Sequence, residues 1–333
     1  MVSIKDVAKH AGVSVTTVSL VLNNKGNISQ DTRRRVLNAV ERLGYTRSIR
    51  ARNLRDQQSR IIGYAQASDR GEFNPLLDHF LYDLVHLVEA SDRHLILFKT
   101  SSQRSLDPYR ELIKSQRVDG FILSYTEAGD SRFRYLYEKE MPFVAFGRSL
   151  TEYDEMAHWV DVDGEHGLYL SAMHLIDQGH ENIAFLGWPE GSASGDMRFA
   201  GFLRALEERG IPFRSELVAR TENYVHNGFA SMAELMQCMP KPTAVAAVSD
   251  ALAIGAIQYL HQIGVRLAVT GFDDTPTAAY MSPPLTTVRQ PIDEVSALLV
   301  EMLIDQLEGR AVQEMNHVLK PELIIRKSST LDY

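Results

Sequence analysis

The chain of 333 residues contains one cysteine, two tryptophans and no long apolar run. A single thiol, Cys238, cannot close an intrachain disulfide, which suits a reducing compartment. No stretch of about 18 apolar residues occurs, and no signal-peptide pattern follows Met1. Secretion and membrane insertion are therefore not expected, and the sequence predicts a cytoplasmic location.

The sequence also lacks the short motifs of common enzyme classes. It has no Walker A loop, no Gly-x-Gly-x-x-Gly turn and no Gly-x-Ser-x-Gly elbow, and His180-Glu181 is not followed by a second His with metal-ligand spacing. The small residues of 191–195 are expected to form only a flexible loop. These absences predict a protein that is not an enzyme and that needs no metal or cofactor.

Charge is divided unevenly along the chain. The first sixty residues hold 12 Lys and Arg but only four acids, whereas the rest holds 23 basic and 39 acidic residues. A basic module joined to an acidic body indicates a polyanion-binding head attached to a part with another task.

The basic head has the pattern of short helices separated by a turn. Ser3 and Asp6 have capping-box spacing, and Gly12 suits a sharp turn before a second cap at Ser14 and a helix over 15–22. A third helix is expected after Ser29, ending at Gly44, with an apolar row formed by Val36, Leu37, Val40 and Leu43. This order of elements predicts a helix-turn-helix.

Residues 4–14 (IKDVAKHAGVS), 17–19 (TVS), 21–23 (VLN) and 43–45 (LGY) resemble the headpiece of the lactose-repressor (LacI/galactose-repressor) family. The resemblance implies that the second helix lies in the major groove of DNA and that Val15, Thr16 and Leu20 read bases. Leu20 departs from the Arg common there and cannot make a bidentate contact to guanine. Short polar side chains favour phosphate contacts at Ser14, Thr17, Asn23 and Ser29.

Residues 46–55 are basic and precede a polar stretch, so they form either an exposed linker or, as the resemblance implies, a hinge that folds on operator DNA. Ala51 and Leu54 share one helical face, with Arg50 and Arg52 among the flanking bases. A small apolar wedge surrounded by phosphate partners is what a kinked minor groove requires.

From residue 61 onward, β-rich runs alternate with helical stretches. Strands are expected at 61–65, 95–98, 120–123, 143–146, 183–186, 244–248 and 267–270, and helices at 76–90, 167–178, 198–209, 251–263 and 292–307. This alternation predicts parallel sheets covered by helices, and the body resembles periplasmic sugar-binding proteins with two lobes.

The expected architecture is an all-α headpiece (1–45), a hinge (46–58) and an α/β body (59–333) of two doubly wound parallel-sheet lobes. The first lobe is expected to comprise 59–160 and 289–318, and the second 161–288 and 319–333. Residues 283–291, another family match, are expected to form the strand that returns to the first lobe. The connection at 264–270 is unusually short.

Ligands of such sheets bind at the carboxyl ends of the strands. The residues expected there combine guanidinium, carboxylate and aromatic groups, which suit a hydroxyl-rich ligand. They are Phe73, Asn74, Arg148, Trp188, Arg198 (expected to open a helix), Asp250, Phe272 and Asp273.

The sequence therefore predicts a ligand-controlled repressor of sugar-utilisation genes that binds a near-palindromic operator as a homodimer. A dimer is favoured over a tetramer because no heptad tail follows the last strand. The alternative is a sugar receptor without a DNA role. Residues 146–149, Trp159, Asp161 and 187–190 look more like glucoside- or maltose-type than purine-type regulators. Induction or co-repression, and a phosphocarrier protein partner, stay open.

Overall fold

The computed structural model describes residues 2–22, 25–45, 58–67, 75–100 and 105–330 of the chain. They form two compact units, Met1–Ser59 and Arg60–Tyr333, each with a core of its own. Within these described ranges, no helix is long and apolar enough to cross a membrane.

The first unit is a bundle of three helices, α1 (Ile4–Ala11), α2 (Val15–Leu22) and α3 (Gln30–Leu43). The predicted capping box is present, since Ser3 Oγ accepts from the Asp6 backbone N–H and the Asp6 carboxylate accepts from that of Ser3. Gly12 (φ 63°) and Gly44 (φ 57°) end α1 and α3 in the left-handed conformation, which favours glycine. The predicted boundaries of the helix-turn-helix are therefore confirmed.

One residue of the predicted apolar row in α3 was assigned wrongly. Leu37 is 48% exposed, whereas Val36 and Ala39 are buried against α1 and α2. Each helical residue turns about 100° from the last, so Leu37 points away from the side that carries Val36, Ala39 and Val40. The row of the bundle core is 36, 39, 40 and 43.

The second unit contains two separate sheets. Sheet A has the order β11-β5-β4-β3-β1-β2, and all of its strand pairs are parallel. Its strands are β1 (Ile61–Ala67), β2 (His94–Thr100), β3 (Gly120–Leu123), β4 (Phe143–Phe146), β5 (His158–Val162) and β11 (Asn316–Leu319).

Sheet B has the order β12-β10-β9-β8-β6-β7, and only β12 runs antiparallel to its neighbour. Its strands are β6 (Ile183–Gly187), β7 (Val218–Arg220), β8 (Ala244–Ala247), β9 (Ala268–Asp273), β10 (Thr286–Arg289) and β12 (Glu322–Ile324). The strand within 283–291 is β10, which belongs to sheet B. Thr286, Thr287 and Val288 are buried in sheet B, and the chain reaches the other sheet only after them.

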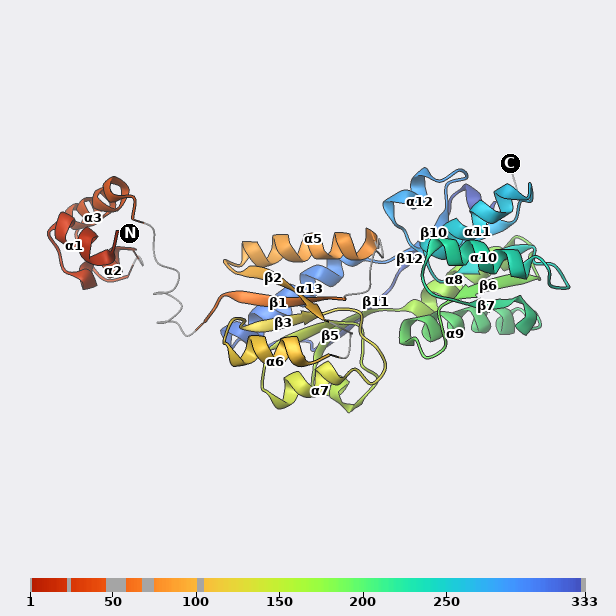
Figure 1. Ribbon diagram of the computed structural model, residues 1–333, viewed down its shortest axis with the longest axis horizontal. Coiled ribbons are helices and arrows are strands. Elements are labelled where there is room, and N and C mark those ends of the chain that lie inside the picture. Colours follow the sequence, from red (N-terminus) through yellow and green to blue (C-terminus); the bar gives the residue numbers. More distant parts are fainter. Residues whose placement is uncertain (1, 23–24, 46–57, 68–74, 101–104, 331–333) are drawn as a thin grey trace. The chain divides into compact units, whose positions relative to one another are not determined.

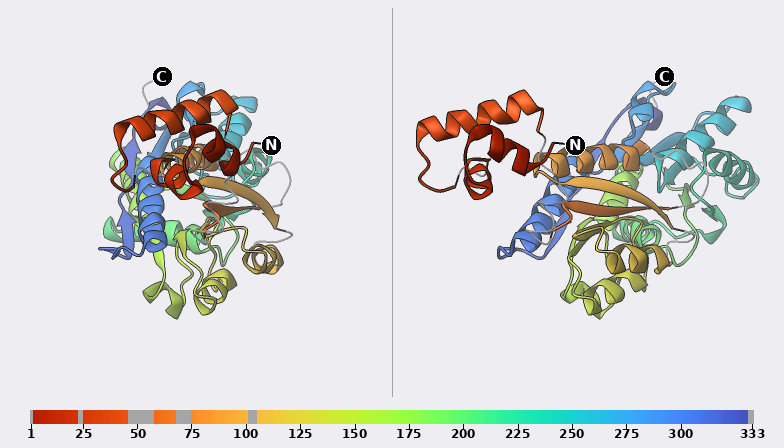
Figure 2. Two further views of the ribbon diagram at one scale, coloured as in Figure 1. Left: turned by 90° about the vertical axis from the view of Figure 1, so that its left-hand side faces the viewer. Right: turned by 60° about the vertical axis from the view of Figure 1, so that its left-hand side comes forward.

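Helices cover both faces of sheet A. α5 (Pro75–Ala90) and α13 (Ile292–Glu308) pack together on one face, and α6 (Asp107–Lys114) and α7 (Ser131–Glu138) on the other (Figure 1). Ile122 faces the α5–α13 side, whereas Phe121 and Leu123 face α6 and α7, as the alternation of a strand requires. Figure 2 shows α5 and α13 from two further sides.

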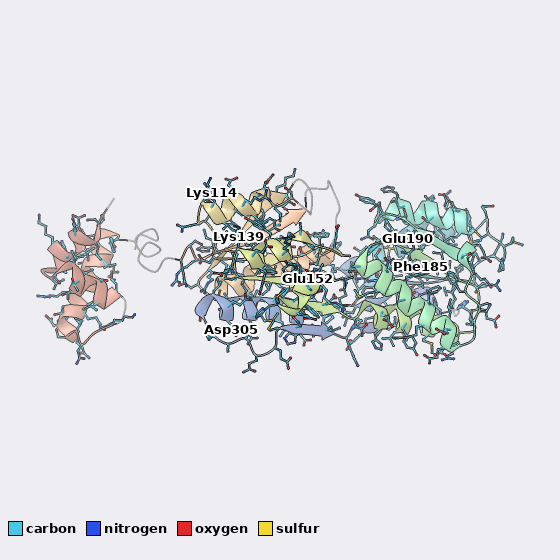
Figure 3. All side chains as sticks on the ribbon, turned by 90° about the horizontal axis from the view of Figure 1, so that it is seen from below. Lys114, Lys139, Glu152, Phe185, Glu190 and Asp305 are labelled. Carbon is cyan, nitrogen blue, oxygen red and sulfur yellow. The ribbon has the colours of Figure 1, made fainter. Side chains whose placement is uncertain are left out.

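Sheet B is enclosed in the same way by α8 (Gly164–Asp177), α9 (Ala193–Glu208), α10 (Val225–Leu235) and α11 (Asp250–Gln262). Phe185 on β6 is fully buried between these layers, while Lys114, Lys139 and Glu152 of the sheet A part lie at its surface (Figure 3). The remaining elements are α12 (Pro276–Tyr280) and the 3₁₀ turns η1 (Glu152–Glu155), η2 (Ser215–Leu217) and η3 (Lys327–Ser329). The predicted doubly wound class is confirmed.

Helix α9 corrects two expectations. Residues 191–195 do not form only a loop, because Ser192 caps α9 and accepts from the Gly195 N–H, and the helix begins at Ala193. Arg198 consequently lies in the second turn of α9 instead of opening it. A serine followed by small residues is common both in loops and at helix N-caps, and here Ser192 is an N-cap.

Candidate DNA-binding and effector sites

Helix α2 presents the predicted base-reading residues on its outer side. Val15 is 41% exposed and Thr16 is exposed, while Val18 and Val21 are buried on the opposite side. Leu20 is half-buried and lies beside Gly26 in the turn after α2. Two of the three residues are therefore open to a partner, and the third also packs on the turn.

Two of the predicted phosphate-contacting residues also cap helices. Ser14 Oγ accepts from the Thr17 N–H at 3.0 Å and lies 2.9 Å from Thr17 Oγ1. Ser29 Oγ accepts from the Thr32 N–H at 3.3 Å and donates to Thr32 Oγ1. A cap leaves the hydroxyl at the positive end of its helix, where a phosphate is also favoured.

Several predicted residues lie outside the described residues. They are Asn23 of the head, Ala51, Leu54, Arg50 and Arg52 of the hinge, and Phe73 and Asn74 of the body. Their assignments stay predictions from the sequence.

Arg198 is the centre of the predicted effector residues that the structure describes. Its guanidinium lies 3.6 Å from the centroid of the Phe272 ring and 4.8 Å from that of Trp188. Nη1 donates to the Val248 carbonyl and lies 3.9 Å from Asp273 Oδ1. The residue is only 6% exposed, so the guanidinium is fixed by its surroundings.

Two buried donors beside each other lack an acceptor. Neither Arg198 Nε nor Trp188 Nε1 has a hydrogen-bond partner among the described residues, although both atoms are shielded from solvent. A buried N–H without a partner costs about 1–3 kcal/mol, so such atoms require an explanation. An oxygen-rich ligand would supply the acceptors.

Asp250 follows β8 and connects it to β10 and to the segment after β9. Its carboxylate accepts from the backbone N–H of Thr275 at 2.7 Å and from the hydroxyls of Thr275 and Thr287. Burial, followed by the nearby Asp273 charge, raises the pKa of Asp250 to about 7. The side chain is turned toward these partners, so its role in this conformation is to fix the segment between the end of β9 and the start of α12.

Asp273 lies at the end of β9 with a positive φ of 119°. Gln290 Nε2 donates to Asp273 Oδ1 at 2.8 Å, and burial raises the pKa of this carboxyl to about 6 despite the nearby Arg198. Since Gln290 lies between β10 and α13, this contact connects the Arg198 cluster to a chain segment that passes between the two sheets.

Arg148 contributes from the sheet A side. Nε donates to Asp161 Oδ2 at 2.8 Å, and Nη2 reaches Met197 Sδ of α9 at 3.0 Å. Its guanidinium also lies over the Trp159 ring. The structure thus brings Arg148, which follows β4 of sheet A, next to α9, the helix of the sheet B part that carries Arg198.

Phe272 does not offer an open ring face. It is fully buried, and the Arg198 guanidinium occupies one side of the ring while Gly167 lies against its edge. The structure therefore places Phe272 beneath Arg198, as a support, while Trp188 is half-buried.

Arg220, on the edge strand β7, was not among the predicted residues. Nη1 donates to the Trp188 carbonyl at 3.1 Å and to Asp196 Oδ1 at 2.9 Å, and the guanidinium lies over the Phe199 ring. Arg220 therefore fixes the segment between β6 and α9 that carries Trp188. A lone Arg in a three-residue strand has no pattern that could have revealed this role.

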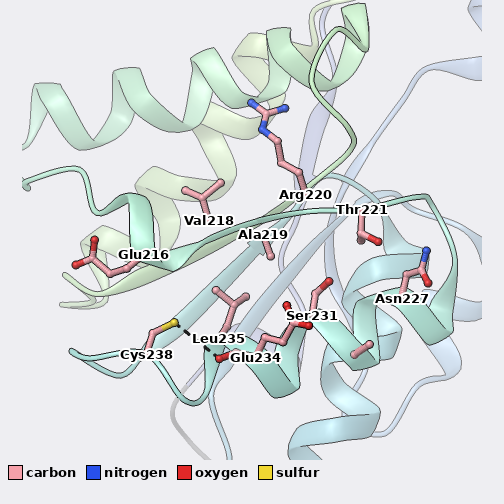
Figure 4. A pocket seen from close by; sticks show the side chains of 11 residues that line it. Glu216, Val218, Ala219, Arg220, Thr221, Asn227, Ser231, Glu234, Leu235 and Cys238 are labelled. Carbon is pink, nitrogen blue, oxygen red and sulfur yellow. Dashed lines mark hydrogen bonds between the residues drawn. The ribbon is translucent and has the colours of Figure 1, made fainter.

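A groove of about 520 Å³ lies beside Arg220, between β7 and one side of α10 (Figure 4). Its lining includes Glu216, Ser231 and Glu234. It is distinct from the Arg198 cluster.

Comparisons with known proteins agree with this arrangement. Residues 3–48 match the model described as bacterial regulatory proteins, lacI family, and 172–329 match the periplasmic binding protein-like domain. The HTH-type transcriptional repressor PurR of Photorhabdus laumondii is 30% identical over 338 residues, which cover 98% of this chain and 97% of the relative.

Two solved structures are similar over nearly the whole chain. The Lac repressor dimer bound to operator and the anti-inducer ONPF has 26% identity and a TM-score of 0.85, covering 98% of this chain and 99% of the other. The complex of the transcriptional regulator CelR with cellobiose has 26% identity and a TM-score of 0.76, covering 99% and 100%.

A helix-turn-helix head on a two-sheet body like a periplasmic binding protein defines a DNA-binding transcriptional regulator rather than an enzyme. The chain belongs to the LacI family of bacterial regulatory proteins, and it is a DNA-binding transcriptional repressor.

Proposed function

We propose that this repressor controls sugar-utilisation genes and that a mono- or oligosaccharide binds between its two sheets. The observation that carries this proposal is the pair of buried donors, Arg198 Nε and Trp188 Nε1, which lack an acceptor among the described residues. Sugar hydroxyls accept from such donors, and Arg148 with Asp161 supplies a second charged pair nearby.

Phe272 is fully buried and offers an open ring face to neither a sugar nor a planar base. The support for a sugar therefore comes from the hydrogen-bond donors and from the similar structures. One similar structure is a complex with cellobiose, which adds support for a glucoside-type ligand. The similar repressor of Photorhabdus laumondii is named PurR, so a ligand screen must also include a purine base.

We further propose that two copies bind a near-palindromic operator. Exposed apolar side chains support a paired state: Tyr82 is 73% and Val85 41% exposed on α5, and Leu97 is 50% exposed on the edge strand β2. Neighbouring apolar groups of this kind mark association surfaces. Pairing would set the spacing of the two heads on DNA.

In this proposal the domain roles are those expected from the sequence. The head (1–45) reads the operator, the hinge (46–58) folds on it, and the two lobes of the body close on the sugar. The membership of sheets A and B supports lobe boundaries near 160 and 319. A DNA-binding regulator acts where the chromosome lies, which supports a cytoplasmic location.

Two measurements test the proposal: DNA retention as a function of salt, and a thermal-shift screen of ligands. Retention of the DNA upstream of the gene should fall steeply with salt, because neutralised phosphates release counterions. A thermal-shift screen should show stabilisation by a glucoside, maltose or cellobiose and none by a purine base. Stabilisation by the purine base alone would assign a different effector class, and DNA retention that is insensitive to salt would remove the operator role.

A further inference from the structure

Outside the DNA and effector sites, the part of the chain that the structure describes holds one cluster of metal-ligating side chains, on the α5–α13 face of sheet A. His79 and Asp83 are one turn apart on α5, and Asp293 is in the first turn of α13. These two helices pack together, so the three side chains meet although Asp293 is distant in sequence.

The donor atoms have the spacing of ligands around one ion. His79 Nε2 is 3.3 Å from Asp83 Oδ2 and 3.1 Å from Asp293 Oδ1, and all three atoms lie within 4.8 Å of one another. Around tetrahedral zinc, with bonds of about 2.0–2.2 Å, neighbouring ligand atoms are about 3.3–3.6 Å apart. Small side-chain rotations would bring the three atoms to that geometry.

We propose that His79, Asp83 and Asp293 bind a divalent transition-metal ion of the zinc type. The imidazole nitrogen argues against magnesium or calcium, which prefer oxygen ligands throughout. His79 and Asp293 are exposed, with 53% and 85% of their side chains accessible, so water can complete the coordination.

The alternative occupant of this cluster is a proton, which would make His79 a cation between two carboxylates. The environment of Asp83 favours a doubly charged ion instead. Asp83 Oδ2 is shielded from solvent, and its 3.3 Å contact with His79 Nε2 lacks the geometry of a hydrogen bond. The ligand oxygens of Asp83 and Asp293 lie within 4.8 Å of each other, so the two negative charges repel. An ion of charge +2 offsets that repulsion more than one proton does.

The position of Asp293 gives the ion a structural consequence. Asp293 lies three residues beyond Gln290, whose side chain donates to Asp273 beside Arg198. A bound ion would fasten the start of α13 to α5, and thereby restrain the segment that passes from sheet B to sheet A. This consequence concerns the effector site, but metal binding itself does not depend on the proposed effector.

Isothermal titration of the metal-stripped full chain with ZnCl₂ tests the site. We expect one saturable ion per chain in the wild type, no such ion in His79→Gln, and at least about tenfold weaker binding in Asp293→Asn, since even outer-shell losses cost about 10- to 100-fold. His94→Gln is the matched control: His94 is an exposed histidine with one carboxylate, Glu89, at 2.8 Å.

The control should bind zinc as the wild type does. Absence of saturable zinc binding in the wild type would leave only a proton-bridged cluster and overturn the proposal. Equal binding by His79→Gln would overturn it as well, because the ion would then lie elsewhere. Both exposed positions tolerate substitution, so a folded variant is expected, and circular dichroism verifies it.

Discussion

Arg198 shows how a single charged residue is made into a rigid recognition group. Aromatic rings on two sides, the Val248 carbonyl and the Asp273 carboxylate leave the guanidinium with one fixed orientation. Burial lowers the pKa of Arg198 from its ordinary value, yet an arginine stays charged at neutral pH. The charge is therefore held ready for an acceptor in a site that excludes most water.

Arg198→Ala should abolish the thermal shift that the sugar produces. Loss of a hydrogen bond from a charged donor costs about 1.5–3 kcal/mol, which corresponds to at least tenfold weaker binding. Arg204→Ala is the control, since Arg204 lies on the same helix but is exposed and pairs with Glu165. An unchanged shift in Arg198→Ala would remove this residue from the effector site.

The buried carboxylates predict a pH dependence of stability. Burial raises the pKa of Asp250 to about 7 and that of Asp273 to about 6, from 3.8. The folded chain therefore holds protons that the unfolded chain has lost. The stability from these groups is complete below about pH 4 and declines as pH rises through 6 to 7. Denaturant titrations between pH 4.5 and 7.5 should show a shallower decline of the unfolding free energy in Asp250→Asn. An identical slope would mean that Asp250 is ionised throughout.

At the level of single residues, the sequence could predict which charged side chains belong to the site better than it could predict their contacts. Arg148, Arg198 and Asp273 were recognised because they follow strand ends, and the structure brings them near one place. The supporting role of Phe272 and the clamp by Arg220 depend on which side of a strand meets which helix. That information arises only when distant segments pack.

Among the elements, those with strong local signals were the easiest to predict. The caps and turns of the head define α1 and α2, and the short apolar runs of β3 and β4 were assigned with their observed ends. β5, β7, β11 and β12 were not among the predicted strands. The last three have only three or four residues each, lie at a sheet edge and are partly exposed. Edge strands are fixed by their neighbours rather than by an alternating pattern.

The hinge is the element whose proposed role is most specific. Leu54→Ala should weaken binding to the operator far more than binding to random DNA, because an inserted side chain stabilises only the kinked site. Fluorescence anisotropy with both DNA duplexes measures the two affinities. Leu37→Ala provides a matched control from the head, since Leu37 is an exposed leucine on α3. Equal losses on both duplexes would show that Leu54 is not a wedge.

For the whole molecule, the proposed dimer gives the heads their spacing. Tyr82→Asp should shift the chain toward monomer, with a dissociation constant raised at least about tenfold, because burial of an aromatic side chain is among the largest contributions to an interface. Tyr137→Asp is the control, since Tyr137 is also exposed but lies on α7, which covers the opposite face of sheet A. Sedimentation velocity distinguishes the two variants, and a stable dimer in Tyr82→Asp would place the interface elsewhere.

Two units, a basic head and an acidic two-sheet body, explain the uneven charge of the chain. A sugar can change DNA binding only if it binds two states of the body unequally, and the coupling must then be reciprocal. The most direct measurement is therefore the operator affinity of the full chain with and without a saturating sugar from the thermal-shift screen. We predict a change of at least about fivefold, the lower end of typical allosteric coupling. Equal affinities in the presence of a sugar that demonstrably binds would contradict ligand-controlled repression.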